Sequence, residues 1–173
     1  MSSRLSNPML TPRIDKITVH IGVGESGERL KRAEEIIKTI TGGRPVRTKA
    51  KKTLPGFSIK KREPIGCKTT LRGKNAETFL HTCFSAAENE LTRDQFDDNG
   101  NFAFGIEEHT DFPDMKYDPK IGIFGMDILV AVKRPGYRVK RRRVLRSTIP
   151  AKHKLKPDDS ISYIKERFNV EVV

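Results

Sequence analysis

The sequence contains no tryptophan, two cysteines and no long apolar run. Cys67 and Cys83 lie far apart, and neither has a second thiol at zinc-site spacing, so we expect two reduced, buried thiols. Either could pair with His81 or His109 at a metal, but the spacing does not require it. No segment approaches the roughly 20 apolar residues of a membrane-spanning helix. Residues 1–11 lack the apolar core of a signal peptide, so we expect an intracellular protein without a membrane contact.

Acidic residues are nearly missing from two stretches that are rich in Lys and Arg. Residues 44–63 contain eight basic residues against Glu63, and residues 128–157 contain eleven with no Asp or Glu. The whole chain carries 34 Lys and Arg against 22 Asp and Glu, a formal net charge of +12. Charge sorted in this way repels itself, so it usually indicates an anionic partner. A polyanion is therefore expected; the alternative is a solvated surface that only maintains solubility.

The pattern of apolar residues predicts an α+β protein. Alternation indicates three half-buried strands, at 16–23, 66–72 and 101–106. A continuous apolar run at 126–132 indicates a central strand that is covered on both faces. Helical spacing indicates three helices, which begin near Ser26, near Asn75 and at Asp158 or Ser160, and it places Phe79 and Phe84 in the core. This order predicts a largely antiparallel sheet with the helices packed on one face.

A basic hairpin is expected to project from this sheet. Short strand-like segments at 46–49 and 57–61 flank a turn at Pro55 and Gly56. The length suits one ordinary domain. We therefore expect a single domain over 1–173, with a basic hairpin arm at about 46–62 and a basic C-terminal extension from about residue 134.

A glycine motif raises the alternative of a nucleotide-dependent enzyme. Gly22, Gly24 and Gly27 spell G-x-G-x-x-G between an expected strand and an expected helix. The dinucleotide fingerprint also needs an acidic residue about 20 positions later. Between Glu35 and Glu63 there is none, so the glycines indicate a tight connection instead. No other catalytic or metal-binding pattern is present, and we expect no enzyme and no cofactor.

Two strand faces combine cations with neutral hydrogen-bonding groups. One face carries Lys16, Thr18 and His20, and the other carries Lys68, Thr70 and Arg72. Such a mixture suits RNA, where Lys and Arg neutralise phosphates and neutral groups reach 2′-hydroxyls and base edges. The alternative is an ordinary solvent face. No zinc finger, basic-region heptad or aromatic RNA-recognition signature is present, so we expect recognition of the shape and backbone of folded RNA.

Several long segments together resemble one protein family. They are KITVHIGVGESG (16–27), TGGRPVRTKAKKTLPGFSIKKREPIGCKTTLRG (41–73), FDDNGNFAFGIEEHTDFPDMKYDP (96–119), IGIFGMDILVAVKRPGYRV (121–139) and PAKHKL (150–155). They are similar to the large-subunit ribosomal protein that binds 5S ribosomal RNA, which is called protein five in bacteria and archaea and protein eleven in eukaryotes. The KRPGYRV segment resembles the archaeal and eukaryotic branch.

The resemblance implies a cytoplasmic protein of the central protuberance of the large ribosomal subunit. It would bind 5S rRNA and 23S rRNA beside other 5S-binding large-subunit proteins. The resemblance also implies that the hairpin tip at 51–58 reaches peptidyl-site tRNA, and that a neighbouring surface bridges to a protein of the small-subunit head. The acidic segment 88–114 would face away from RNA or touch a basic protein.

Site residues follow from the strand faces, the basic stretches and the resemblance together. The expected rRNA-binding residues are Lys16, Thr18, His20, Arg44, Thr48, Lys49, Lys68, Thr70, Arg72, Arg138, Lys140, Arg141, Arg142 and Arg143. The expected tRNA-binding residues are Lys51, Lys52, Thr53, Leu54, Pro55, Gly56 and Phe57. Three 5S-contacting positions of the family fall on His20, Gly43 and Thr70. The bacterial pattern has Asn in place of His20 and Gln in place of Gly43, which leaves at most a backbone contact at Gly43.

Overall fold

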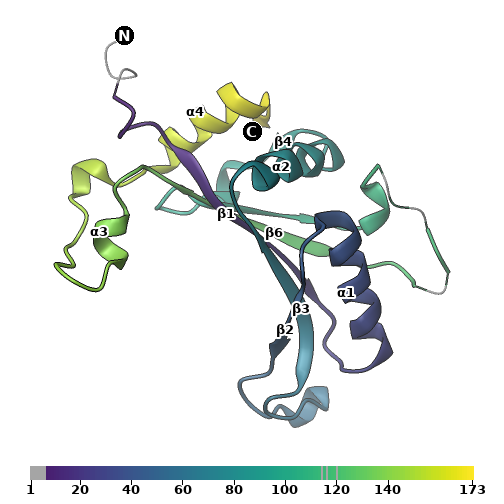
Figure 1. Ribbon diagram of the computed structural model, residues 1–173. Coiled ribbons are helices and arrows are strands. Elements are labelled where there is room, and N and C mark those ends of the chain that lie inside the picture. Colours follow the sequence, from purple (N-terminus) through teal and green to yellow (C-terminus); the bar gives the residue numbers. More distant parts are fainter. Residues whose placement is uncertain (1–6, 114, 116, 120) are drawn as a thin grey trace.

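A five-stranded antiparallel sheet forms the centre of the computed structural model, which describes residues 7–113, 115, 117–119 and 121–173. The strand order is β2-β3-β1-β6-β5. The bounds are β1 (Arg13–Gly22), β2 (Val46–Lys49), β3 (Pro64–Leu71), β5 (Phe102–Ile106) and β6 (Met126–Lys133). The helices α1 (Glu28–Thr41) and α2 (Lys74–Ala86) lie on one side of the twisted sheet (Figure 1). The predicted α+β fold is confirmed.

The C-terminal part of the chain adds short elements at one end of this sheet. The four-residue helix α3 (Arg138–Arg141) follows β6 and lies on a separate projection (Figure 1). The helix α4 (Pro157–Phe168) comes next. The two-residue strand β7 (Glu171–Val172) then pairs in parallel with β4 (Glu90–Leu91), which ties the end of the chain to the segment after α2.

The core lies between the sheet and its helices. Ile17, Val19 and Ile21 of β1 are fully buried, as their alternation predicts. They face the helices, and Leu30 and Ile37 of α1 are also fully buried. The polar residues between them on β1 occupy the opposite face of the sheet, which no helix of the described residues covers (Figure 1). We call this uncovered side the open face.

A group of aromatic rings, two of them stacked on Phe84 and one edge-on to it, closes the core beside α2. The ring of Phe84 lies 6.3 Å from that of Phe102, 5.6 Å from that of Phe104 and 5.4 Å from that of Phe168, measured between centroids. These partners come from β5 and α4, so Phe84 joins three elements. The prediction that Phe79 and Phe84 belong to the core is confirmed, since both are buried.

Two strand predictions are wrong in detail. In β6, Asp127 and Leu129 are exposed, so this strand is covered on one face rather than on both. A protein with helices on one side of its sheet has no second layer to cover that face. Residues 57–61 form no strand: Pro55–Phe57 is a 3₁₀ turn, and β2 pairs with β3 instead.

The helix starts also differ from the prediction. The helix α1 begins at Glu28 after Gly27 (φ 113°), and α2 begins at Lys74 after Gly73 (φ 63°). These positive φ angles turn the chain sharply from strand into helix, and glycine adopts them without strain. Ser26 therefore does not cap α1.

The cysteines are buried and unpaired, as predicted. Burial raises the pKa of the Cys67 thiol to about 11 and raises the pKa of Cys83 as well, so both stay protonated at neutral pH. Within the described ranges, no three His, Cys, Asp or Glu side chains gather in a way that could hold a metal ion. No helix among the described residues is long and apolar enough to cross a membrane.

Candidate nucleic-acid interface

The two predicted polar strand faces lie side by side on the open face. In the antiparallel pairing of β1 with β3, His20 is opposite Lys68 and Thr18 is opposite Thr70. Lys16 continues the row on β1. Antiparallel neighbours bring such residues within a few ångströms of each other. The sequence pattern therefore identified one continuous surface of cations and hydroxyls.

The open face is shallowly hollowed beside this row. Depressions of about 340 and 530 Å³ lie on either side of Leu129 of β6. Thr18 of β1 and Ala103 of β5 line both depressions, and Ala131 of β6 lines the smaller one. Leu129 is 45% exposed in the middle of this region, although its strand was expected to be covered. A flat polar partner can thus approach the backbone closely.

Gly66 keeps the edge of the open face free of side chains. A Cβ atom at this position would lie 2.8 Å from the carbonyl oxygen of Ile21, 2.9 Å from Oγ1 of Thr48 and 3.4 Å from Nε2 of His20. The glycine thus lets Thr48 and His20 approach each other across β3. His20 also lies beside Asp127 of β6, with Nδ1 3.5 Å from Oδ2. Sequence reasoning missed Gly66 and Asp127, because only strand register brings them to this site.

Arg72 is held differently from the rest of the row. Its Nη1 donates to the backbone oxygen and to Oδ1 of Asp15, both at 3.2 Å. Asp15 also accepts from Lys133 of β6 and lies 3.6 Å from Nη1 of Arg141. Burial raises the pKa of Asp15. The hydrogen bond from Lys133 and the charges of Lys133, Arg141 and Arg72 lower it by more, so the pKa of Asp15 lies below its ordinary value. Arg72 and Arg141 are therefore already paired with a carboxylate.

The arm, residues 46–62, projects beyond the end of the sheet (Figure 1). Its tip is folded, since the backbone groups of Leu54 and Ile59 bond to each other and Lys61 N–H donates to Oγ1 of Thr53 at 3.1 Å. Phe57 is 76% exposed at the end of this tip. Lys51 and Lys52 are exposed, and the described residues offer their side chains no partner. All seven residues expected to bind tRNA thus lie together on one exposed tip.

Glu63, the one acid of this basic stretch, fixes the base of the arm. Its Oε1 accepts from Ser26 Oγ and its Oε2 accepts from the backbone N–H of Lys60, both at 2.8 Å. The hydrogen bond from Lys60 and the one from Ser26 lower the pKa of Glu63. The carboxylate therefore orients the arm and leaves the cations of the tip unopposed.

Three other predicted positions, Arg44, Lys49 and Gly43, lie in or just before β2 and apart from the row on the open face. Arg44 and Lys49 are exposed on the sheet edge. At Gly43 a Cβ atom would lie 2.9 Å from Oγ1 of Thr69, and the backbone N–H of Gly43 donates to Oγ1 of Thr41 at 3.2 Å. The N–H is thus used within the protein, so a backbone contact from Gly43 to RNA would have to come from its carbonyl.

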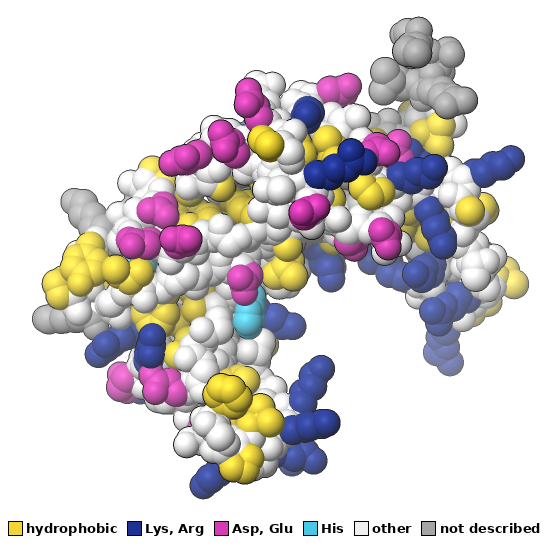
Figure 2. Space-filling view, turned by 180° about the vertical axis from the view of Figure 1, so that it is seen from behind, with side chains coloured by type: hydrophobic (Ala, Val, Ile, Leu, Met, Phe, Trp, Pro, Cys, Tyr) yellow, Lys and Arg dark blue, Asp and Glu magenta, His cyan; other side chains and the backbone are white. Residues whose placement is uncertain are grey.

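The second basic group lies on the other projection. Arg138, Lys140, Arg141, Arg142 and Arg143 lie in and just after α3, and all five are exposed. Figure 2 shows dark-blue side chains gathered on the lower lobe, which is the arm, and on the right-hand lobe around α3, whereas magenta predominates at the upper left. The structure therefore brings the predicted RNA-binding residues together in three groups: the row on the open face, the arm and the group around α3.

Residues 88–113, the described part of the acidic segment, include β4 and β5. Asp97 stabilises its turn, because its carboxylate accepts from the N–H groups of Asn99 and Asn101 at 2.9 and 2.8 Å. Arg93 pairs with Asp158 of α4 at 3.0 Å. Asp114 lies outside the described residues. The charge that is sorted along the chain is thus also sorted in space.

Sequence comparison identifies the family. Residues 7–60 match the model of ribosomal protein L5, and residues 64–152 match that of the ribosomal L5P family C-terminus. The large ribosomal subunit protein uL5 of Methanococcoides burtonii is 57% identical over 97% of this chain and 99% of its own length. The chain belongs to the ribosomal protein L5 family.

Other relatives agree. Large ribosomal subunit protein uL5 of Methanoregula boonei is 55% identical over 92% of this chain and 96% of its own length. The protein of that name from Methanococcus vannielii is 54% identical over 96% of this chain and 93% of its own length. The predicted archaeal type is confirmed.

Family membership also settles the enzyme alternative. Members of the L5 family are structural ribosomal proteins, so this chain is an RNA-binding protein of the large subunit and not an enzyme, and it works on the ribosome in the cytoplasm. The glycine motif fits this conclusion. Gly24 (φ 80°) and Gly27 (φ 113°) form a tight connection out of an antiparallel strand, whereas a dinucleotide site requires a parallel βαβ unit.

Proposed function

We propose that this protein binds 5S rRNA and 23S rRNA in the central protuberance of the large subunit. The observation that carries the proposal is the register of β1 and β3, which aligns Lys16, Thr18, His20, Lys68 and Thr70 on an uncovered sheet face. The neutral groups of this row can reach 2′-hydroxyls and base edges, while the cations neutralise phosphates. The open face and the base of the arm, with Arg44, Thr48 and Lys49, would contact 5S rRNA, and the α3 group would hold rRNA phosphates.

The arm supports a second contact, to peptidyl-site tRNA. Its tip combines two cations without partners in the described structure, Lys51 and Lys52, with the exposed side chains of Leu54 and Phe57. Lysines attract the tRNA backbone and an exposed ring can stack on a base or pack against a ribose. The position of the tip, far from the open face, allows both RNAs to be bound at once (Figure 1).

The acidic side of the molecule suits protein neighbours. A surface rich in Asp and Glu repels RNA and attracts basic proteins. We propose that the surface around 88–114 meets a basic protein, and that a neighbouring surface bridges to a protein of the small-subunit head. Other 5S-binding proteins of the large subunit would lie beside the open face.

We propose that residues 1–173 form one domain. The sheet supports this proposal, because β3 of the second matched segment lies between β2 and β1 of the first. One hydrophobic core contains residues of both segments.

Binding of 5S rRNA should depend strongly on salt. If about six phosphates are neutralised, a plot of log affinity against log salt concentration should fall with a slope of roughly 4 to 5. Filter binding or fluorescence anisotropy over a salt series measures this slope. A nearly salt-independent affinity, or equal affinity for an unrelated structured RNA, would contradict the proposal.

The open face and the arm tip should separate by mutation. Thr70→Ala removes a neutral hydroxyl from the open face and should weaken 5S rRNA binding about threefold to tenfold, the cost of one or two hydrogen bonds. Lys51→Ala combined with Lys52→Ala should leave 5S affinity within about twofold and weaken the tRNA contact of assembled subunits. The opposite pattern would show that the two surfaces are wrongly assigned.

A further inference from the structure

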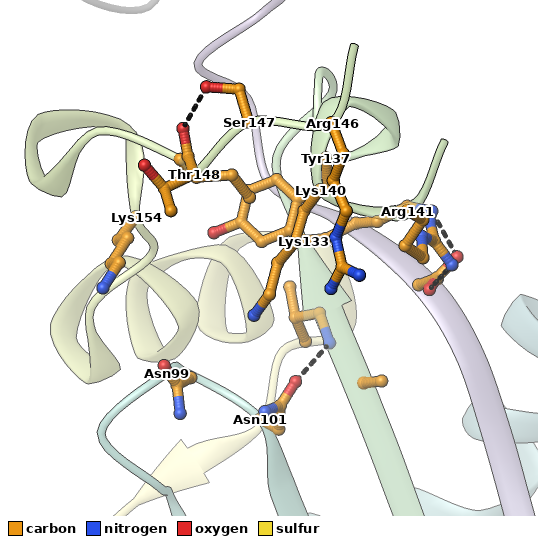
Figure 3. Close-up of a pocket in the computed structure, with 14 residues that line it drawn as sticks. Asn99, Asn101, Lys133, Tyr137, Lys140, Arg141, Arg146, Ser147, Thr148 and Lys154 are labelled. Atoms are coloured by element: carbon orange, nitrogen blue, oxygen red, sulfur yellow. Dashed lines mark hydrogen bonds and ion pairs between the residues drawn. The ribbon is translucent and has the colours of Figure 1, made fainter. Parts of the chain in front are cut away.

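A large hollow lies at the end of the molecule that carries α3. Its volume is about 1060 Å³, and it is half-open to solvent. The end of β6, the helix α3 and residues 146–154 enclose it on one side, and the turn before β5 encloses it on the other (Figure 3). Segments that are distant in the sequence thus form one concave site.

The hollow carries positive charge that the protein does not neutralise. Among the described residues that line it are five cations and one acid, Asp15, which Lys133 and Arg141 face. The side chains of Lys140, Arg146 and Lys154 are exposed, and no described residue pairs with any of them. These three unpaired cations surround one concave site, so an anion that extends across the hollow could contact all of them.

Neutral groups line the rest of the hollow. Asn99 and Tyr137 lie on opposite sides of it (Figure 3), and Tyr137 contributes its one aromatic ring among the described lining residues. The Tyr137 oxygen accepts from the backbone N–H of Leu155 at 3.2 Å, which fixes the ring. Asn101 is already engaged, since its Oδ1 accepts from Val132 N–H at 3.3 Å and its Nδ2 donates to Asp97 at 2.8 Å. The amide of Asn99 has no such bond in the described structure, so it can both donate and accept.

We propose that this hollow binds unpaired RNA, with the phosphates at Lys140, Arg146 and Lys154 and a base between Asn99 and Tyr137. Unpaired bases are recognised by stacking on aromatic rings and by hydrogen bonds to their edges, and both groups are present here. The bases of a double helix are stacked and paired, so a duplex would meet the cations alone. The volume is at the upper end of that for small-molecule sites, which is enough for one or two nucleotides. The proposal rests on the proposed rRNA-binding function and adds the form of RNA that this end of the protein selects.

A matched pair of lysine variants tests the site. Lys154→Ala and Lys152→Ala each remove one exposed positive charge from the same segment, but of the two residues only Lys154 lines the hollow. For a single-stranded RNA hexamer, Lys154→Ala should weaken the affinity about fivefold to tenfold and Lys152→Ala less than twofold. For a duplex of the same length, the two variants should behave alike. Equal losses for the hexamer would overturn the proposal, because they would show a diffuse charge effect.

The base is tested separately from the phosphate. A hexamer with one central abasic position keeps every phosphate, and it should bind the full-length protein at least about fivefold more weakly than the complete hexamer. Asn99→Ala should remove most of the preference among the four bases at that position. If the abasic hexamer binds as tightly as the complete one, or if an oligoglutamate peptide of equal charge competes equally well, the hollow is a general anion site and the proposal is wrong.

The same samples separate this inference from the proposed function. Affinity for 5S rRNA is measured on each variant beside the hexamer. Intact 5S binding that remains sensitive to Thr70→Ala, together with equal hexamer losses for the two lysine variants, would overturn the nucleotide site alone. Loss of any preference for 5S rRNA in the unmodified protein would overturn the proposed function itself.

Discussion

Replacing Phe84 by alanine is expected to lower the free energy of unfolding by about 4 kcal/mol. Its ring is 1% exposed and contacts rings from β5 and α4. Truncation removes the apolar surface and leaves a cavity, because three separate elements cannot all move inward to fill it. A marginally stable domain would lose much of its stability.

Phe57→Ala is the matched control, because the same atoms are removed from a ring that is 76% exposed. It should change the free energy of unfolding by less than about 0.5 kcal/mol. Urea unfolding followed by circular dichroism measures both variants. Equal destabilisation would show that the ring of Phe84 does not join β5, α2 and α4 in the folded protein.

The strands that build the sheet could be predicted because one face of the sheet is apolar and the other is polar. Alternation located β1 and β3 to within a few residues, and it placed Ile17 and Val19 in the core. The continuous apolar run at 126–132 located β6 but predicted the wrong number of covered faces. A run of apolar residues cannot distinguish a strand covered on both faces from one whose Leu129 stays exposed, since only the number of layers decides this.

The candidate site divides in the same way. Thr18 and Thr70 could be predicted as neighbours, because each belongs to a clear strand face and two antiparallel strands bring such faces together. The hollow could not be predicted. Asn99 and Arg146 line it together only because of the tertiary fold, and no periodicity in the sequence links them. The sequence also does not show which cations are free to bind RNA. Arg72 was predicted from a strand face and Arg141 from a basic stretch, but both are paired with Asp15.

Asp15→Asn is expected to have opposite effects on stability and on RNA binding. The Asp15 side chain is 15% exposed and lies among Arg72, Lys133 and Arg141, which come from the turn after β3, from β6 and from α3. Asparagine keeps the shape but loses the charge, so the free energy of unfolding should fall by about 2 to 3 kcal/mol. The released arginines should then bind RNA more tightly, about twofold to threefold at low salt. Asp98→Asn is the control, because it makes the same change in charge at an exposed residue for which the described structure shows no ion pair.

The pH dependence follows from the lowered pKa of Asp15 in the folded protein. A carboxyl whose folded pKa lies below its unfolded value of about 3.9 stabilises the protein above that value, and this contribution is lost as the pH falls through the folded pKa. The difference in stability between the unmodified protein and Asp15→Asn should therefore be full at pH 6 and shrink below about pH 4. Urea unfolding at a series of pH values measures it. A difference that does not change with pH, or RNA affinity that falls together with stability, would show that Asp15 acts through its shape and not through the three cations it binds.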